Sequence, residues 1–276
     1  MSDFTAKSMR KLNNGIEMPI IGIGTWKIPD GGPVVNTVSW ALEAGYRLID
    51  TARLYKNEWG VGNAIKNSGI PRSEIFVTTK VPPQTMSERA TIKAFDKSLK
   101  ELGLEYIDLY LIHWPLPYFR QHTWAAVQKI YASGKCRAIG VANYCLKHLK
   151  ALLKETGIVP AVDQVEFHPY LYQKDLLELC QSKGIQLEAY SPLTHGYRLD
   201  DERIAAIGRK YNKTIAQTML RWSLQHGTIV IPKSVHQHRI MENISIFDFE
   251  LSSADMNAID ALNENYHYIW DPCTLS

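Results

Sequence analysis

The chain has few cysteines, and they form no pattern that suggests a disulfide framework. Cys136, Cys145, Cys180 and Cys273 are the only four, and no two of them stand in a C-x-x-C pair. Secreted domains that depend on disulfides carry many closely spaced cysteines. We therefore expect four reduced thiols in a cytoplasmic protein.

A targeting segment and a strong excess of charge are also missing. The start, MSDFTAKSMRKLNNG, lacks the apolar core of a signal peptide, and no later apolar run approaches the roughly 20 residues of a membrane span. The net charge is only +3 and is dispersed, which gives no reason to expect nucleic acid or a membrane as partner. We expect a monomer whose partner is a small molecule.

No linker, low-complexity segment or block of like charges divides the chain. Apolar residues make up 45% and charged residues 21% of the sequence, which is ordinary for a globular protein. A chain of 276 residues is long enough for one large α/β barrel or for two small domains. Without a visible linker, we expect residues 1–276 to form a single domain.

What the sequence does contain is a short apolar run followed by an amphipathic stretch, repeated eight times. The runs PIIGIGT, RLID, IFVTTK and IDLYLIH, for example, end at Thr25, Asp50, Lys80 and His113. Near-continuous apolar strands that alternate with helices are typical of parallel strands covered on both faces. Eight such units favour a (β/α)8 TIM barrel, which needs about 250 residues, with a doubly wound open sheet as the alternative.

Turn and cap residues predict two local features. The pattern around Asn14-Gly15 predicts an N-terminal β-hairpin that plugs one end of the barrel. Ser87 and Gly103, which bracket a long amphipathic stretch, predict the N-cap and the C-terminal stop of a helix.

Polar residues stand at the carboxyl ends of the predicted strands. Asp50, Lys80 and His113 are three of them, and Tyr55 follows Asp50 by five residues. In a (β/α)8 barrel these ends meet at one face, where active sites are built. Because a buried carboxylate is costly without a partner, we expect Asp50 to pair with Lys80.

These four side chains suit a reaction in which a carbonyl oxygen gains negative charge and then a proton. A tyrosine has a pKa of about 10, which an adjacent ammonium lowers. We expect Lys80, oriented by Asp50, to tune Tyr55 as a proton donor in this way. His113 can hydrogen-bond the carbonyl oxygen. The alternative is an ion pair that only ties strands together, with Tyr55 on the surface.

Two motifs are rejected as binding sites. GIGTWK begins like a dinucleotide-binding fingerprint, but Lys27 stands where the third glycine belongs. His236 and His238 have no further ligand at metalloenzyme spacing. We expect neither a Rossmann site nor a metal.

Two other groups of residues are candidates for binding. Lys233, Ser234 and Arg239 follow the last predicted strand and can hold a phosphate monoester, with a solvated basic patch as the alternative. Trp26 and Trp114 stand at strand ends, where we expect them to wall an apolar carbonyl pocket rather than only to pack in the core.

Over nearly its whole length the sequence resembles the aldo-keto reductases. The resemblance is carried by GYRLIDTARLYKNEWGVG, IYASGKCRAIGVANY and IVIPKSVHQHRIMENI, with LYLIHWP as a fourth marker. The short C-terminal tail and LGLEYIDLYLIHWP are similar to small microbial and protist members, including the 2,5-diketogluconate reductase and protist prostaglandin F synthase types. The resemblance implies NADP(H)-dependent reduction of aldehydes or ketones on a TIM barrel.

The resemblance also implies a role for each matching residue. Tyr55 matches the proton donor, Asp50 and Lys80 its tuning pair, and His113 the residue that orients the carbonyl. The cofactor positions are Asn143 and Gln164 for the nicotinamide carboxamide, Tyr190 for stacking under the nicotinamide, Ser191 and Leu193 along the pyrophosphate, Lys233, Ser234 and Arg239 for the 2′-phosphate that selects NADPH, and Glu242 and Asn243 for the adenine edge. We add Gly24 and Thr25 to the NADPH site. Trp26, Trp114, His113 and the tail aromatics Tyr266, Tyr268 and Trp270 are expected to shape the substrate site.

Two positions depart from the family pattern. Ala142 stands where a serine is usual, which predicts one hydrogen bond fewer to the carboxamide, and Thr194 and His195 replace a glycine-rich turn over the cofactor. Two other functions stay open. One is a non-catalytic NADPH-binding, redox-sensing regulator, and the other is a barrel isomerase or lyase with Lys80 as a Schiff-base nucleophile.

Overall fold

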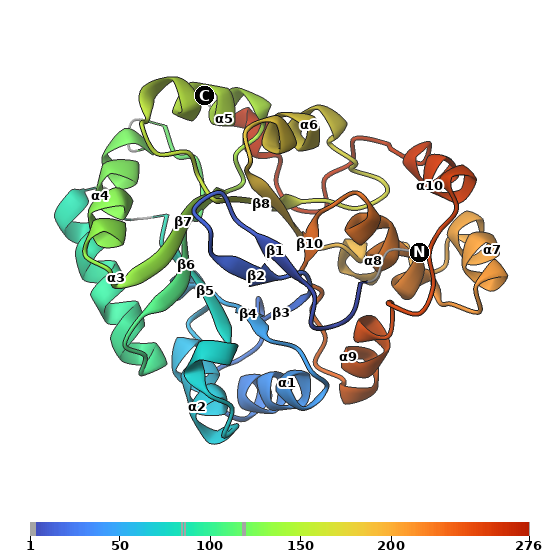
Figure 1. Cartoon of the computed structure of the whole chain (residues 1–276), viewed down its shortest axis with the longest axis horizontal. Helices are drawn as coiled ribbons and strands as arrows, with labels where there is room; N and C mark the ends of the chain where they lie inside the picture. Colours follow the sequence, from blue (N-terminus) through green and yellow to red (C-terminus); the bar gives the residue numbers. More distant parts are fainter. Residues whose placement is uncertain (1–3, 84, 86, 118–119, 276) are drawn as a thin grey trace.

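Eight parallel strands form the centre of the molecule (Figure 1). The computed structural model describes residues 4–83, 85, 87–117 and 120–275. The eight barrel strands are β3 (Gly22–Gly24), β4 (Leu48–Asp50), β5 (Phe76–Val81), β6 (Ile107–Ile112), β7 (Cys136–Ala142), β8 (Val162–Glu166), β9 (Gln186–Tyr190) and β10 (Ile229–Val230). Two further strands, β1 (Met9–Lys11) and β2 (Glu17–Pro19), precede them. Strands β3 to β10 pair in chain order, and β1 and β2 form a separate antiparallel pair.

The sheet curls until its two edge strands meet. Ile21 forms a bridge with Val230 of β10, and the backbone N–H of Gly24 donates to the carbonyl of Pro232 at 3.0 Å. The strand order never reverses, whereas a doubly wound sheet requires such a reversal. The predicted (β/α)8 barrel is therefore confirmed, and the open-sheet alternative is wrong.

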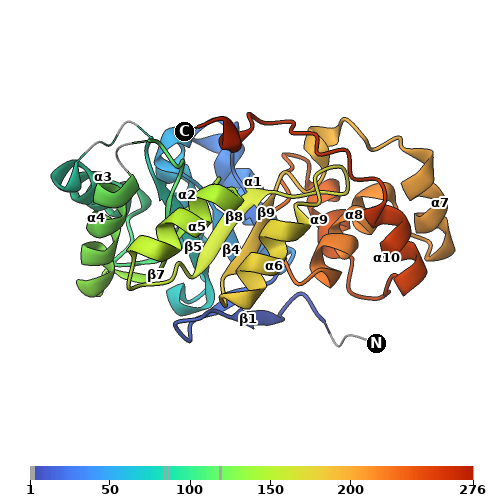
Figure 2. The ribbon, with the colours of Figure 1, turned by 90° about the horizontal axis from the view of Figure 1, so that it is seen from above.

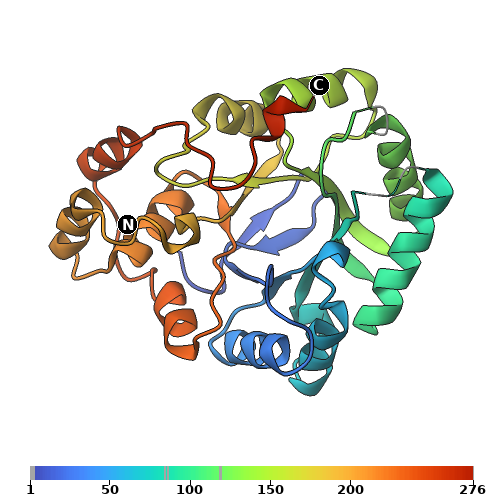
Figure 3. The ribbon, with the colours of Figure 1, turned by 180° about the vertical axis from the view of Figure 1, so that it is seen from behind.

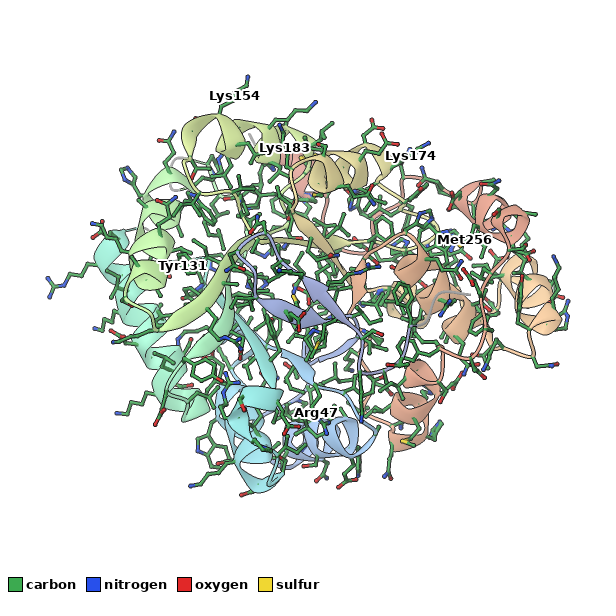
Figure 4. All side chains as sticks on the ribbon, viewed as in Figure 1. Arg47, Tyr131, Lys154, Lys174, Lys183 and Met256 are labelled. Carbon is green, nitrogen blue, oxygen red and sulfur yellow. A yellow bond between two sulfur atoms is a disulfide. The ribbon has the colours of Figure 1, made fainter. Side chains whose placement is uncertain are left out.

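Helices surround the barrel (Figure 1). They are α1 (Gly32–Glu43), α2 (Glu58–Asn67), α3 (Glu88–Leu102), α4 (Arg120–Ala132), α5 (Leu146–Glu155), α6 (Lys174–Ser182), α7 (Glu202–Lys210), α8 (Ile215–Gln225), α9 (Gln237–Ile244) and α10 (Ser253–Asp260). Both predicted caps of α3 are confirmed, because the Ser87 side chain accepts from the N–H of Ala90 and Gly103 ends the helix at φ 65°. Side chains on the outer helix faces, such as Lys154 of α5, extend away from the barrel (Figure 4). None of the helices in the described ranges is both long and apolar enough to cross a bilayer.

The N-terminal hairpin closes one end of the barrel, as predicted. The pairing runs from Met9 with Pro19 to Lys11 with Glu17. Leu12 and Met18 pack among the side chains that fill the barrel interior. Figure 2 shows this hairpin at one end of the barrel and the C-terminal segment at the other. The hairpin therefore leaves the carboxyl ends of the strands as the open face.

The expectation of four reduced thiols is wrong. Cys145 and Cys273 form a disulfide across a sequence separation of 128 residues, while Cys136 and Cys180 are buried free thiols. Spacing in the sequence gives no sign of this pair, because the C-terminal segment crosses the open face of the barrel and ends beside α5 (Figure 3). The disulfide fastens that segment to the start of α5.

Removing this disulfide is expected to free the end of the chain while the barrel stays folded. In Cys273→Ser the segment keeps other contacts, including the pair between His148 Nε2 and the carbonyl of Leu275 at 2.9 Å. We expect chymotrypsin to release C-terminal peptides about tenfold faster or more, because local opening governs cleavage. Mass spectrometry measures the rate. Cys180→Ala, which removes a buried free thiol, is the matched control, and equal cleavage of all three proteins would contradict the prediction.

Candidate active site

A cavity of about 670 Å³ opens at the carboxyl ends of the barrel strands. This volume suits an organic ligand of substantial size. Most of the residues predicted from the sequence line it: Gly24, Trp26, Asp50, Tyr55, His113, Trp114, Asn143, Gln164, Tyr190, Ser191, Leu193, Lys233, Ser234, Arg239, Glu242 and Asn243. Of the residues predicted for catalysis and for the cofactor, Lys80 and Thr25 lie outside the lining. Lys80 is fully buried, and Thr25 donates its hydroxyl to the carbonyl of Asp50 at 2.9 Å.

Asp50 and Lys80 form a buried ion pair between adjacent strands, as predicted. Lys80 Nζ donates to Asp50 Oδ1 at 2.8 Å and Oδ2 at 2.7 Å, and to the carbonyl of Thr51 at 2.9 Å. These three bonds use all three N–H groups of the ammonium. A charged, fully bonded amine is a poor nucleophile, which argues against the Schiff-base alternative.

Tyr55 lies on a 3-10 turn (Arg53–Tyr55) just after β4, and its ring centroid is 5.1 Å from Lys80 Nζ. Desolvation raises the pKa of Tyr55 well above its ordinary value, and the charge of Asp50, with that of Glu188 when it is ionised, raises it further. The sequence predicts the opposite direction, from Lys80 alone. That prediction is wrong for the protein without ligand, because burial of the phenol is the largest cause of the shift and Asp50 and Glu188 act in the same direction.

His113 follows β6 and is buried beside Tyr55, with 5.7 Å between the two ring centroids. Burial lowers the pKa of His113 well below its ordinary value, and the charge of Lys80 lowers it further. The imidazole is therefore neutral near pH 7. Its Nδ1 has no hydrogen-bond partner among the residues the structure describes. A neutral ring at the edge of the cavity can donate one N–H to a bound oxygen.

Amide and phenol groups form one wall of the cavity. Asn143 Nδ2 donates to the carbonyl of His113 at 2.8 Å, and the Tyr190 hydroxyl donates to Asn143 Oδ1 at 2.7 Å. Gln164 Nε2 donates to Asp50 Oδ2 and to Glu188 Oε2, both at 2.8 Å. These bonds fix the orientation of both amides and of the Tyr190 ring.

Asn57 holds the loops that carry Thr25 and Tyr55. Its Nδ2 donates to the carbonyls of Thr25 at 2.9 Å and Ile28 at 3.0 Å, and its Oδ1 accepts from the Thr51 hydroxyl at 2.8 Å. A single buried side chain therefore joins the loops after β3 and β4. Asn57, two residues after Tyr55, therefore has a structural role in holding these loops together.

A basic rim lies where the last strand leads into α9. The side chains of Lys233 and Arg239 are exposed, and the buried Ser234 hydroxyl accepts from the N–H of His236 at 3.1 Å, one residue before α9. Partial desolvation by the surrounding atoms and the neighbouring charge of Lys27 lower the pKa of Lys233, although its residue surface is exposed. Exposed cations at a helix N-terminus favour an anion.

Glu242 and Asn243 sit further along α9, at the far end of the cavity. The Glu242 carboxylate accepts from the Thr214 hydroxyl at 2.6 Å, at the N-cap of α8. Asn243 is buried. The two residues therefore continue the cavity wall beyond the basic rim.

The loop after β9 lies against Trp26. His195 and Trp26 meet edge to face with 5.4 Å between ring centroids, and His195 Nε2 is 3.0 Å from the Ser191 hydroxyl. Ser191, Thr194 and His195 all have positive φ. His195 therefore contacts Trp26 at the cavity, a contact that the glycine-rich turn usual in the family would not make, because glycine has no side chain.

The aromatic tail contributes less to the cavity than the sequence predicts. Trp270 packs on Trp114 with 5.6 Å between ring centroids, and Ile269 is the tail residue that lines the cavity. Tyr268 stacks on Tyr197 and accepts from Arg198, and Tyr266 packs on Tyr268 outside the lining. Of the three tail aromatics expected to shape the substrate site, only Trp270 contacts a tryptophan of the cavity lining, and Tyr266 and Tyr268 pack on each other away from it.

The sequence-based prediction assigned no role to two buried carboxyl groups near the site, Glu166 and Glu188. Glu166 accepts from the backbone N–H groups of Tyr268 at 2.9 Å and Ile269 at 3.2 Å, and so anchors the tail. Glu188 accepts from Gln164, as described above. Glu188 could have been found from the sequence. It stands two residues before Tyr190 in an apolar strand, so the side chains of Glu188 and Tyr190 lie on the same side of the sheet.

Comparison with known proteins gives consistent results. A model of the Aldo/keto reductase family matches residues 20–264. Glyoxal reductase of Bacillus subtilis strain 168 is 52% identical over 259 residues, which are 94% of this chain and 94% of that protein. The 9,11-endoperoxide prostaglandin H2 reductase of Trypanosoma cruzi is 46% identical over 264 residues, which are 95% of this chain and 93% of that protein. A crystal structure of a Bombyx mori aldo-keto reductase in complex with NADP superposes with a TM-score of 0.90 at 36% identity, covering 96% of this chain and 95% of that chain.

Proposed function

This chain belongs to the aldo/keto reductase family, and we propose that it uses NADPH to reduce aldehydes or ketones to alcohols, with Tyr55 as the proton donor. The observation that carries the proposal is that Tyr55, His113 and the Asp50–Lys80 pair meet at one cavity at the open end of the barrel. Each of these groups has a use in delivering a proton to a carbonyl oxygen.

The cavity fits NADP(H). A Cβ at Gly24 would lie 3.3 Å from the carbonyl of Ile231, so a larger residue there would narrow the cavity. We assign Asn143 and Gln164 to the carboxamide, Tyr190 to the nicotinamide face, and Lys233, Ser234 and Arg239 to the 2′-phosphate. When bound, the reduced nicotinamide supplies a hydride to the carbonyl carbon.

Side chains of the protein hydrogen-bond and protonate the carbonyl oxygen. The neutral His113 ring donates a hydrogen bond to it, and the Tyr55 phenol donates the proton. Lys80, kept charged by Asp50, stabilises the phenolate that Tyr55 becomes. Trp26 and Trp114 narrow the mouth and exclude water, which strengthens these interactions.

The experiment that tests the proposal follows NADPH oxidation by absorbance with the purified protein. The panel contains glyoxal, methylglyoxal, aromatic aldehydes, keto sugars and quinones, with NADH in parallel. Glyoxal is included because the Bacillus subtilis relative is a glyoxal reductase. Turnover with NADPH supports the proposal. Tight binding of NADPH without turnover supports the regulator instead, and absence of binding contradicts both.

Arg239→Ala is expected to raise the Kd for NADPH about 10- to 100-fold and the Kd for NADH less than about twofold. The difference arises because a charge-assisted hydrogen bond to the 2′-phosphate is worth roughly 1.5–3 kcal/mol. Fluorescence titration measures both dissociation constants. Arg209→Ala, which removes an exposed arginine of α7 paired with Glu202, is the matched control. Equal losses for the two nucleotides would contradict the 2′-phosphate assignment.

A further inference from the structure

A second buried carboxyl, Glu188, lies below the cavity. It stands in the middle of β9, two residues before Tyr190, and its side chain is fully buried. Parallel pairing sets it beside Gln164 of β8 and Ile229 of β10. Because strand side chains alternate, Glu188 and Tyr190 lie on the same side of β9.

Glu188 and Asp50 share one hydrogen-bond donor. Gln164 Nε2 is 2.8 Å from an oxygen of each carboxyl. Asp50, whose two oxygens both accept from Lys80, can only accept, so the amide nitrogen and not the amide oxygen of Gln164 faces the two carboxyls. The two N–H groups of Gln164 are thereby used, and Oε1 is the amide atom left for the cavity that Gln164 lines.

We propose that Glu188 is a positioning residue: together with Asp50 it fixes the Gln164 amide so that Oε1 accepts a hydrogen bond from the carboxamide of the cofactor. The inference rests on the NADPH-dependent function proposed above. Neither carboxyl alone would hold both N–H groups of the amide.

Burial and the charge of Asp50 favour the neutral form of Glu188 near pH 7. The titratable groups that act on it are Asp50 of β4 and Lys80 of β5, and Glu188 acts in turn on Tyr55. Lys80 already donates to both oxygens of Asp50. Burial and the charge of Asp50 raise the pKa of Glu188 to about 8, although the Gln164 bond and Lys80 act to lower it. A neutral carboxyl still accepts from Gln164 through Oε2.

Ionisation of Glu188 therefore changes the site as the pH rises through about 8. A second negative charge then stands beside Asp50, with one ammonium to balance both. This charge raises the pKa of Tyr55 and opposes negative charge on a carbonyl oxygen. Carbonyl reduction is expected to slow over this interval.

Two substitutions separate positioning from titration. Glu188→Gln has the same shape, stays neutral at every pH and can accept from Gln164. We expect its kcat/KM at pH 7 to stay within about twofold of the wild type, while its alkaline decline moves up by at least about one pH unit. Glu188→Leu removes the acceptor, and we expect its Kd for NADPH to rise about tenfold, as for one lost hydrogen bond. A Kd for NADPH in Glu188→Leu equal to that of the wild type would overturn the inference, and identical pH profiles for the wild type and Glu188→Gln would overturn the assignment of the alkaline decline to Glu188.

A measurement on the resting protein is independent of turnover. Infrared difference spectra of the wild type minus Glu188→Gln should show a protonated carboxyl band that disappears as the pH rises through about 8. The subtraction cancels Asp163, another buried carboxyl whose pKa burial raises. If the band titrates but no carbonyl is reduced, the proposed function fails and the neutral Glu188 stands. If carbonyls are reduced but the band is absent, Glu188 is ionised, and the positioning role then depends on the Kd of Glu188→Leu for NADPH.

Discussion

Tyr55→Phe is expected to lower kcat for carbonyl reduction about a thousandfold or more and to change the Kd for NADPH less than about twofold, because proton transfer by a positioned side chain contributes roughly 10²–10⁴-fold. The substitution removes one hydroxyl and leaves the ring beside His113 and Lys80. The high pKa of Tyr55 means that the hydroxyl keeps its proton until a carbonyl oxygen takes negative charge. Single-turnover kinetics with saturating NADPH measure the chemical step.

Tyr110→Phe is the matched control for Tyr55→Phe. Tyr110 of β6 is fully buried against Phe95, and its hydroxyl has no hydrogen-bond partner in the described part of the chain. Losing that hydroxyl should leave kcat and Kd unchanged. Retained turnover in Tyr55→Phe would assign the proton to another group beside the ring, such as His113 or Lys80.

Lys80→Met is expected to lower the free energy of unfolding by about 3–5 kcal/mol, because it leaves the Asp50 carboxylate buried without its counter-ion. The ammonium makes three hydrogen bonds at the base of the cavity, and both partners are nearly inaccessible to water. Carbonyl reduction should be lost as well, since nothing would then stabilise the phenolate of Tyr55. Urea denaturation at pH 7 measures the stability.

The double variant Asp50→Asn with Lys80→Met separates these two effects. It removes both charges, so most of the stability should return, as it does when buried ion pairs are replaced together. Activity should not return, because the ammonium is still absent. A double variant as unstable as Lys80→Met would show that the hydrogen bonds, rather than the unpaired charge, set the cost.

The fold was predictable because each of its signals is local. A barrel whose strands pair in chain order needs only the alternation of apolar runs and helices, and caps such as Ser87 and Gly103 mark helix ends. The pairing of Asp50 with Lys80 was predictable for the same reason, since they end adjacent strands. The family motifs then assigned cavity-lining residues as distant in sequence as Tyr55 and Arg239.

Two properties could not be predicted from the sequence, because each depends on residues that are far apart in the chain. The raised pKa of Tyr55 follows from burial and from the charges of Asp50 and Glu188, and of these two carboxyls the sequence-based prediction included only Asp50. The contact between Cys145 and Cys273 depends on the path of the tail, which no periodic pattern encodes. In each case the deciding partner is remote in the chain.

The Cys145–Cys273 bond also reaches beyond the tail, because it closes the chain into a covalent ring. The ring contains β8, β9, β10 and helices α5 to α10, whereas β3 to β7 lie outside it as a linear arm. In the denatured state the ring part cannot extend as far as an open chain of the same length. The oxidised protein therefore exposes less new surface to denaturant on unfolding than the reduced protein does, so its denaturant dependence is shallower. The three strands inside the ring and the five strands outside it therefore belong to parts of the chain that differ in how far they can extend when the barrel unfolds.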